Sequence, residues 1–134
     1  MNALLYAAVR CGDTERVAAL IDAGADIDGR DRYNQTSLMN AARLGHIELV
    51  RSLVDRGAAL NVTAKYGLTA LMLAIIGYHE EAACILIRAG ADPTVRGGKG
   101  AIGYFGKTAL DLAMERNQGQ VVALLQRCAA PRGE

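Results

Sequence analysis

The stretch QTSLMNAA, residues 35–42, returns as LTALMLAI at residues 68–75 and as KTALDLAM at residues 107–114. The first two copies are separated by a step of 33, and the last two by a step of 39. In each copy a threonine stands before apolar residues spaced three and four apart, which predicts a helix with a hydroxyl group at its N-terminal cap. A shorter copy, ALLYAA at residues 3–8, precedes them at the same step of 33. The period predicts four copies of one unit, with six additional residues in the last connection.

A second helix follows the first in each unit, and glycines mark where the helices end. The segments HIELVRSLVDR (46–56) and HEEAACILIRA (79–89) carry apolar residues at helical spacing. The glycines that follow the second helices recur at the same step, at Gly24, Gly57 and Gly90. The first helices are expected to end at Gly12, Gly45, Gly77 and Asn117, residue types that tolerate a left-handed turn. Because Tyr78 stands where the other units use Gly or Asn, the third of these helices is expected to end one residue early, at Gly77.

The period of 33, the T-x-L start, the paired alanines, the G-H pair and the G-A-D close together resemble the ankyrin repeat over roughly residues 2–128. The resemblance implies an all-α solenoid of stacked helix-turn-helix pairs joined by hairpin-like loops. It also implies a concave face, lined by the loops and the first helices, that binds other proteins. The family's T-P-L-H appears here as TSLM, TALM and TALD, so its proline and histidine are missing. Loss of the proline should matter little at a first helical turn, whereas loss of the histidine removes a side-chain bond between neighbouring loops, which are therefore expected to be less rigid.

The repeats divide the chain into a single domain and a short tail. The domain is expected to span residues 1–130, and its repeats about residues 1–30, 31–63, 64–96 and 103–130, with an insertion at about 97–102 and a tail at 131–134. A single repeat cannot bury its own apolar face, so neighbouring repeats stabilise one another by stacking. Polar residues in the outer helices of the first and last repeats indicate caps, and we therefore expect a monomer.

Composition excludes several classes of function. The formal net charge of +1 argues against a nucleic-acid binder. No apolar run approaches the roughly 18 residues that span a bilayer, and the opening residues predict no secretory leader. The three cysteines, Cys11, Cys84 and Cys128, form no C-x-x-C pair, which favours reduced thiols in the cytoplasm. His46 and His79 have no metal-binding spacing to these cysteines, so neither a metal nor a cofactor is expected.

One stretch, GKGAIGYFGKT at residues 98–108, matches G-x-G-x-x-G and nearly matches the phosphate-binding G-x-x-x-x-G-K-[ST]. The repeat explains most of it, since Thr108 is the helix-start threonine of the fourth unit and Gly106 aligns with Gly67 and Asn34. A phosphate loop also needs a preceding buried strand, and the residues before this one are short and polar. An extended hairpin is the favoured interpretation, with nucleotide binding or anion binding at the helix start left as alternatives.

The loops between repeats carry most of the aromatic residues. Tyr33, Tyr66 and Phe105 each stand three residues before the helix-start threonine, and Tyr104 precedes Phe105. Tyrosine is enriched at the centres of protein interfaces, although each ring could instead pack on the next loop. The loops also carry an excess of basic residues, namely Arg30, Arg32, Lys65, Arg96, Lys99 and Lys107 against Asp28 and Asp31. This excess favours a partner with an acidic surface, unless these are only solvated turn residues.

The first helices are expected to add outward-facing residues to the same surface. Leu73 and Ile76 are expected to form an apolar floor in the third unit, although ordinary core packing would also explain them. The residues expected to contact a partner are Arg32, Tyr33, Gln35, Asn40, Arg43, Lys65, Tyr66, Leu68, Leu73, Ile76, Tyr104, Phe105 and Lys107.

No set of residues suggests catalysis. His46 and His79 share one register position, which predicts a structural role such as a hydrogen bond to a neighbouring backbone carbonyl. The sequence therefore favours a non-enzymatic protein-binding module that binds through the loop tips and the concave face. Two alternatives remain: a nucleotide-binding or anion-binding protein that uses residues 98–108, and a structural or self-associating scaffold.

Overall fold

The computed structural model describes residues 1–100 and 103–129, and within them the chain forms eight α-helices, one 3-10 turn and no strand. The α-helices are α1 (Ala3–Cys11), α2 (Thr14–Asp22), α3 (Ser37–Leu44), α4 (Ile47–Asp55), α5 (Ala70–Ile76), α6 (Glu80–Arg88), α7 (Ala109–Glu115) and α8 (Gly119–Ala129), and the 3-10 turn is η1 (Lys65–Gly67). Two residues of the expected insertion (101–102), the last residue of the expected fourth repeat and the tail at 131–134 lie outside the described residues.

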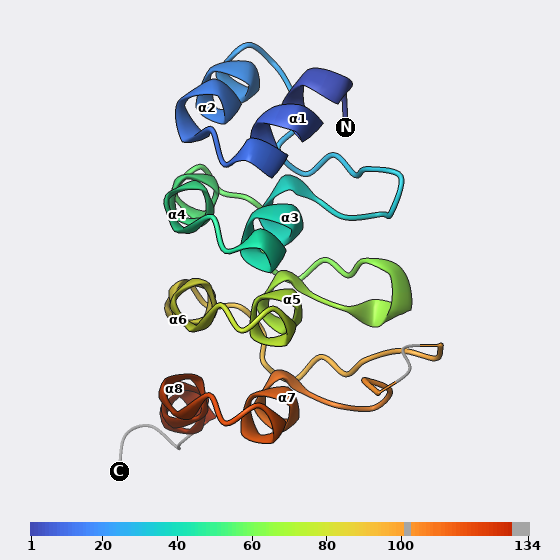
Figure 1. Cartoon of the computed structure of the whole chain (residues 1–134), viewed down its shortest axis with the longest axis vertical. Helices are drawn as coiled ribbons and strands as arrows, with labels where there is room; N and C mark the ends of the chain where they lie inside the picture. The colour runs from blue at the N-terminus through green and yellow to red at the C-terminus, as the bar shows by residue number, and fades with distance from the viewer. Residues whose placement is uncertain (101–102, 130–134) are drawn as a thin grey trace.

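The helices pair along the chain and the pairs stack in one direction (Figure 1). The odd-numbered helices form one column and the even-numbered helices form a second column beside it. Three long loops project from the odd-numbered column, away from the even-numbered one. We call them finger 1 (residues 23–36), finger 2 (56–69) and finger 3 (89–100 and 103–108). This arrangement confirms the predicted all-α solenoid of stacked helix pairs.

Threonine caps begin three of the odd-numbered helices, as the sequence predicts. The Thr36 hydroxyl accepts from the amide of Met39, the Thr69 hydroxyl from Met72 and the Thr108 hydroxyl from Asp111. The capping oxygen satisfies an amide that the first turn of a helix leaves without a partner. The same threonine therefore ends a finger and starts a helix in each of these units.

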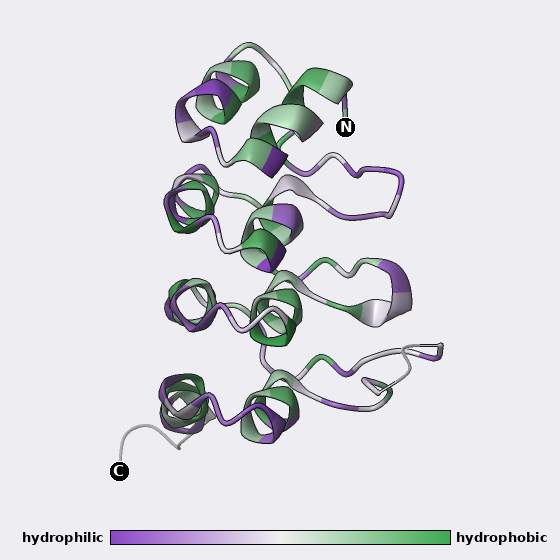
Figure 2. Cartoon of the chain, viewed as in Figure 1, coloured by the Kyte–Doolittle hydropathy of each residue, from purple (hydrophilic) through white to green (hydrophobic). Residues whose placement is uncertain are grey.

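The core runs through the middle of the stack, between the two columns. Figure 2 shows the apolar parts of the helices turned toward one another and the polar parts turned outward. The largest fully buried side chains include Leu38, Leu49, Leu71, Leu86 and Leu112. Small alanines such as Ala41 and Ala74, both completely buried, let neighbouring helices approach closely. Each unit thus buries its apolar stripe against the units above and below it.

The turn after α5 differs in one respect from the sequence expectation. The helix ends at Ile76 with Gly77 as its C-terminal cap, as expected, but the left-handed residue is Tyr78, with φ of 62°, since Gly77 has φ of −81°. Tyr78 lies at the register position of Gly12 and Gly45, which have φ of 71° and 76°. The His79 amide donates to the carbonyl of Ala74, repeating the bond that starts α4 in the preceding unit. The register required for stacking therefore outweighs the glycine's own preference for the left-handed region.

The residues that precede α4 and α8 each bind the unit before them. His46 Nε2 lies 2.9 Å from the carbonyl oxygen of Arg10, which confirms the predicted structural role for this histidine. Gln118, at the same register position in the last unit, donates from Nε2 to the carbonyl of Ile75 at 2.7 Å. These bonds join consecutive units at the turns between their helices.

Hydrogen bonds also join the fingers to one another. Arg30 Nη1 in finger 1 donates to the carbonyl of Thr63 in finger 2 at 2.7 Å. The amide of Gly98 in finger 3 donates to the carbonyl of Tyr66 in finger 2 at 2.6 Å.

None of the helices in residues 1–100 and 103–129 combines the length and apolar character that a bilayer-spanning helix requires.

Candidate functional site

Three aromatic rings of the fingers are exposed to solvent. Tyr33, Tyr66 and Phe105 are 56%, 43% and 62% exposed, so much of each ring is free of protein contact. We call these three residues the finger-tip row. They occupy one register position in three successive fingers, and these fingers project from the same side of the stack (Figure 1). The ring of Tyr66 also lies against Gly100 of finger 3, so it contacts the next finger in addition to facing solvent.

A cation accompanies an aromatic ring in each finger. The guanidinium carbon of Arg32 lies 5.8 Å from the centre of the Tyr33 ring, and Lys65 Nζ lies 5.0 Å from that of Tyr66. In finger 3 the register position of Arg32 and Lys65 is occupied by Tyr104, and the cation comes from Arg116 at the end of α7, 5.7 Å away. A cation above an aromatic face is weakly attracted to it and keeps its hydrogen-bonding groups available at the edge.

Several residues predicted to contact a partner lie in the core. Asn40, Leu68 and Leu73 are only 1%, 9% and 6% exposed, and Leu112, at the register position of Leu73 in the last unit, is fully buried. The outward assignment of these side chains is wrong, because α3, α5 and α7 are covered by neighbouring units and by the base of a finger. Ile76, at the end of α5, is half-buried and packs against the core. The predicted apolar floor therefore does not form as a free surface.

The polar members of this group hold finger 1 against α3. The Asn40 side-chain amide donates to Asp31 Oδ2 at 3.0 Å and to the carbonyl of Thr36 at 3.1 Å. Arg43 donates to the side-chain oxygens of Asn40 and Gln35. Because Asp31 Oδ1 also accepts the amides of Tyr33 and Gln35, this network sets the conformation that projects the Tyr33 ring. Asn40 thus acts beneath the surface and not on it.

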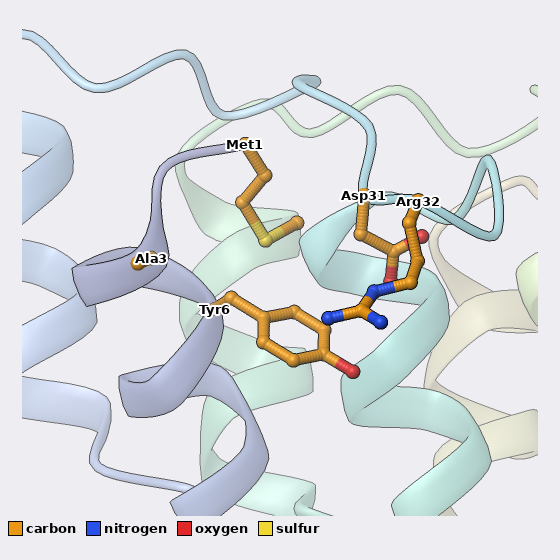
Figure 3. A pocket seen from close by; sticks show the side chains of 5 residues that line it. All are labelled: Met1, Ala3, Tyr6, Asp31 and Arg32. Carbon is orange, nitrogen blue, oxygen red and sulfur yellow. The ribbon is translucent and has the colours of Figure 1, made fainter.

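A pocket of about 260 Å³ opens between α1 and finger 1 (Figure 3). Its lining residues are Met1, Ala3, Tyr6, Asp31 and Arg32. Figure 3 shows the guanidinium group of Arg32 beside the ring of Tyr6, which the sequence analysis did not single out. Tyr6 stands at the register position that the buried residues Met39 and Met72 occupy in the next two units. A tyrosine in place of a buried methionine is the sequence signal that distinguishes it.

Tyr78 and Arg116 form a second cluster that the sequence analysis did not place in the site. Tyr78 is 65% exposed, and the Arg116 guanidinium carbon lies 5.9 Å from the centre of its ring. Arg116 therefore stands near both Tyr78 and Tyr104, which come from different units. The available signal was the tyrosine at a register position otherwise occupied by Gly or Asn. Its pairing with Arg116, which belongs to the following unit, depends on how the units stack.

The glycine-rich loop has little capacity to hold a phosphate in its described part. The amides of Gly97, Gly98, Gly106 and Lys107 all donate to backbone carbonyls of the fingers. Lys107 Nζ is paired with Glu115 Oε1 at 2.7 Å, so its charge is already balanced. A phosphate loop uses such amides and such a lysine for the ligand. This geometry favours the hairpin interpretation of residues 98–108.

A carboxylate also occupies the start of α7. The Asp111 side chain accepts hydrogen bonds from the backbone amide and the hydroxyl of Thr108, and the backbone bond is the main reason that the pKa of Asp111 is lowered. An ionised carboxylate at a helix N-terminus interacts favourably with the helix dipole and opposes the approach of an anion.

Burial raises the pKa of the Cys84 thiol, which disfavours a reactive thiolate at this position. No group of three or more potential metal-binding side chains occurs within the described residues.

The comparison with known proteins identifies a family. No curated protein matches the chain. A family model described as ankyrin repeats in three copies matches residues 4–97, a range that runs from the first turn of α1, past α6, into finger 3. The fourth helix pair, α7 and α8, continues the same architecture beyond the match. With more than half of its length matched, the chain belongs to the ankyrin repeat family.

Proposed function

We propose that the protein binds another protein through the finger-tip row and the cations beside it, and that it has no catalytic activity of its own. Ankyrin repeats generally serve as protein–protein interaction modules. The observation that carries the proposal for this chain is the exposure of Tyr33, Tyr66 and Phe105 at one register position in three successive fingers. Large rings held in solvent by a hydrogen-bonded loop supply contact area with little loss of conformational entropy on binding.

The charges of the fingers support an acidic surface on the partner. Arg51 of α4 pairs with Glu81 of α6, and Arg56, which directly follows α4, pairs with Asp22 of α2. In the part of the chain that the structure describes, Arg32 and Lys65 form no such ion pair, so each presents an uncompensated positive charge beside a ring. Complementary charge mainly increases the rate of encounter and selects against basic partners.

The setting that fits this proposal is a monomer in the cytoplasm. Cys11, Cys84 and Cys128 are all free thiols, and Cys11 and Cys128 are exposed, which suits a reducing compartment. A monomer leaves the finger-tip row available to the partner. Sedimentation velocity at two concentrations tests this directly, since a self-associating scaffold would sediment faster at the higher concentration.

The test of binding uses a double substitution, Tyr33→Ala with Tyr66→Ala. Affinity capture from the native host followed by mass spectrometry identifies the partner, and calorimetry with the purified partner then measures the dissociation constant. Truncation of two interface tyrosines is expected to weaken binding at least tenfold, while the melting temperature changes little because both rings are exposed.

The matched control is Leu4→Ala with Met114→Ala. These two side chains are 67% and 55% exposed, and they lie on α1 and α7, away from the finger tips. The control variant is expected to bind the partner as tightly as the wild type. Equal binding by the tyrosine variant and the wild type would reject the finger-tip row as the binding surface.

A further inference from the structure

We infer that Arg116, held between Tyr78 and Tyr104, anchors one carboxylate of an acidic peptide segment in the partner protein. This inference rests on the proposed protein-binding function and adds to it the chemistry of one contact. The cluster lies where the end of α5, the end of α7 and finger 3 meet. Its three residues are distinct from the finger-tip row and from the buried network under finger 1.

The Arg116 guanidinium has aromatic neighbours but no anionic partner among the described residues. Its central carbon lies 5.9 Å from the ring centre of Tyr78 and 5.7 Å from that of Tyr104. Its Nε atom is buried and makes no hydrogen bond within this part of the chain. A buried donor without a partner is unfavourable, because it has lost its water and gained nothing in return. Because Nε is buried as the side chain stands, a carboxylate would supply the missing acceptor once the side chain turns outward, and arginine is suited to such two-point contacts.

The nearest acidic residue in the sequence is already engaged. Glu115 Oε1 accepts from Lys107 Nζ at 2.7 Å, so these two charges balance each other. Arg116, next to this balanced pair, keeps its positive charge available. A single carboxylate neutralises the charge of Arg116. A polyanion such as a nucleic acid would also be repelled by the neighbouring carboxylate of Glu115. The formal net charge of +1 for the whole chain points the same way.

The recurrence of the cation–ring pair in each finger supports a role beyond stability. Fingers 1 and 2 make the pair from adjacent residues, Arg32 with Tyr33 and Lys65 with Tyr66. Finger 3 has Tyr104 in place of the cation, and Arg116 from the end of α7 restores the pair. Different residues thus place a cation beside an aromatic ring of each finger. The rings of Tyr33 and Tyr66 are 56% and 43% exposed and lie outside the buried core, so the pairs add little to core packing.

The backbone at Tyr78 gives an independent reason to assign this cluster a function. Its φ of 62° is unfavourable for a side chain with a Cβ, and the equivalent residues Gly12, Gly45 and Asn117 are types that tolerate it. The ring is 65% exposed, so burial of the ring does not compensate for this strain. Strained conformations of this kind occur preferentially at binding sites.

The experiment is a selection from a random peptide display library against the wild type, Arg116→Gln and Arg51→Gln. Arg51 is an exposed arginine on α4 that pairs with Glu81, so it controls for the loss of one positive charge. Wild type and Arg51→Gln are expected to select peptides with Asp or Glu enriched at one position. Arg116→Gln is expected to lose that enrichment.

Binding of one selected peptide then isolates the contact. Replacing its enriched Glu by Gln should weaken binding to the wild type about tenfold and leave binding to Arg116→Gln unchanged, which is the signature of a direct pair. Arg116→Lys should retain an intermediate preference, since it keeps the charge and loses the planar group. Circular dichroism melts of all variants show whether each is folded.

The outcomes separate this inference from the proposed function. The inference is overturned if the acidic preference survives in Arg116→Gln, or if the selected peptides contain no acidic residues. The proposed function is still upheld in that case if peptide binding depends on Tyr33 and Tyr66. Binding of a single-stranded oligonucleotide that depends on Arg116, in place of peptide binding, overturns both. Failure of the wild type to select any peptide above a blank surface also counts against both.

Discussion

Tyr78 shows how a single residue can be placed by its neighbours in space against its own preference. The preceding residue, Gly77, is the one that tolerates a left-handed backbone best, yet the left-handed φ falls on Tyr78. The turn must put His79 at the start of α6 in the same place as His46 at the start of α4. A shift by one residue would rotate α6 by about 100° and turn its apolar stripe away from the stack. The cost of a strained tyrosine is smaller than the loss of that packing.

Replacing Tyr78 by Gly and by Ala measures this strain. Both substitutions remove the exposed ring, but only Gly relieves the unfavourable φ of 62°. The Gly variant is expected to be more stable than the Ala variant by about 1 kcal/mol. Urea unfolding followed by circular dichroism compares the two free energies of unfolding. Equal stabilities would mean that the backbone at residue 78 is not strained.

Helix α7 depends on its N-terminal cap because it has only seven residues. The Thr108 hydroxyl accepts from the Asp111 amide, and the Asp111 carboxylate accepts from Thr108. This reciprocal arrangement satisfies two amides that the short helix cannot satisfy itself. It also joins the end of finger 3 to the start of the fourth unit, so the element that leads to Arg116 is set in place by Thr108.

The cap of α7 predicts a dependence of stability on pH. The pKa of Asp111 is lowered by the hydrogen bond from the Thr108 amide, so the carboxylate stabilises the fold at pH values above its unfolded pKa. This contribution is lost as the pH falls through the lowered pKa of the folded state. Asp111→Asn should therefore cost about 0.5 kcal/mol at pH 7, and the difference from wild type should shrink below about pH 4.

Urea unfolding of both proteins at pH 7, 5 and 3 checks this expectation. The two chains share every other titrating group, so their difference in unfolding free energy isolates Asp111. A difference that stays constant down to pH 3 would contradict a role for the ionised carboxylate.

The molecule as a whole is held together by contacts between neighbouring units. The middle units are covered on both sides, and Leu71 of α5, at 1% exposure, lies inside the stack. The outer units are covered on one side only, and Leu4 and Met114 at the two ends remain largely exposed. Stability in such a stack is approximately the sum of the units and their interfaces. The third unit should therefore carry more of the total than the first or the last.

Leu71→Ala tests the importance of the central interface. Removing a fully buried leucine side chain leaves a cavity and is expected to cost about 3 kcal/mol. Leu4→Ala, with the same chemical change at an exposed site, should cost less than about 0.5 kcal/mol. Urea unfolding gives both values, and similar losses for the two variants would refute the assignment of Leu71 to the core.

Much of the fold was predictable from periodicity. The repeat period located the helix pairs, the threonine caps at Thr36, Thr69 and Thr108, and the structural role of His46. These features repeat because each unit must present the same two faces to its neighbours, so every copy supports the assignment of the others. The finger-tip row was predictable for the same reason, since its three rings share one register position.

The composition of the surface followed from the stacking of the units. Asn40, Leu68 and Leu73 were expected to face outward and are buried, because contacts from the next unit and from a finger cover them. Tyr78 and Arg116 lie far apart in the sequence and come together only where consecutive units meet. A repeat pattern specifies which residues are equivalent in different units. Which residues from different units touch, and which remain open to a partner, depends on the spacing and rotation between units, and these are set by side-chain packing in the assembled stack.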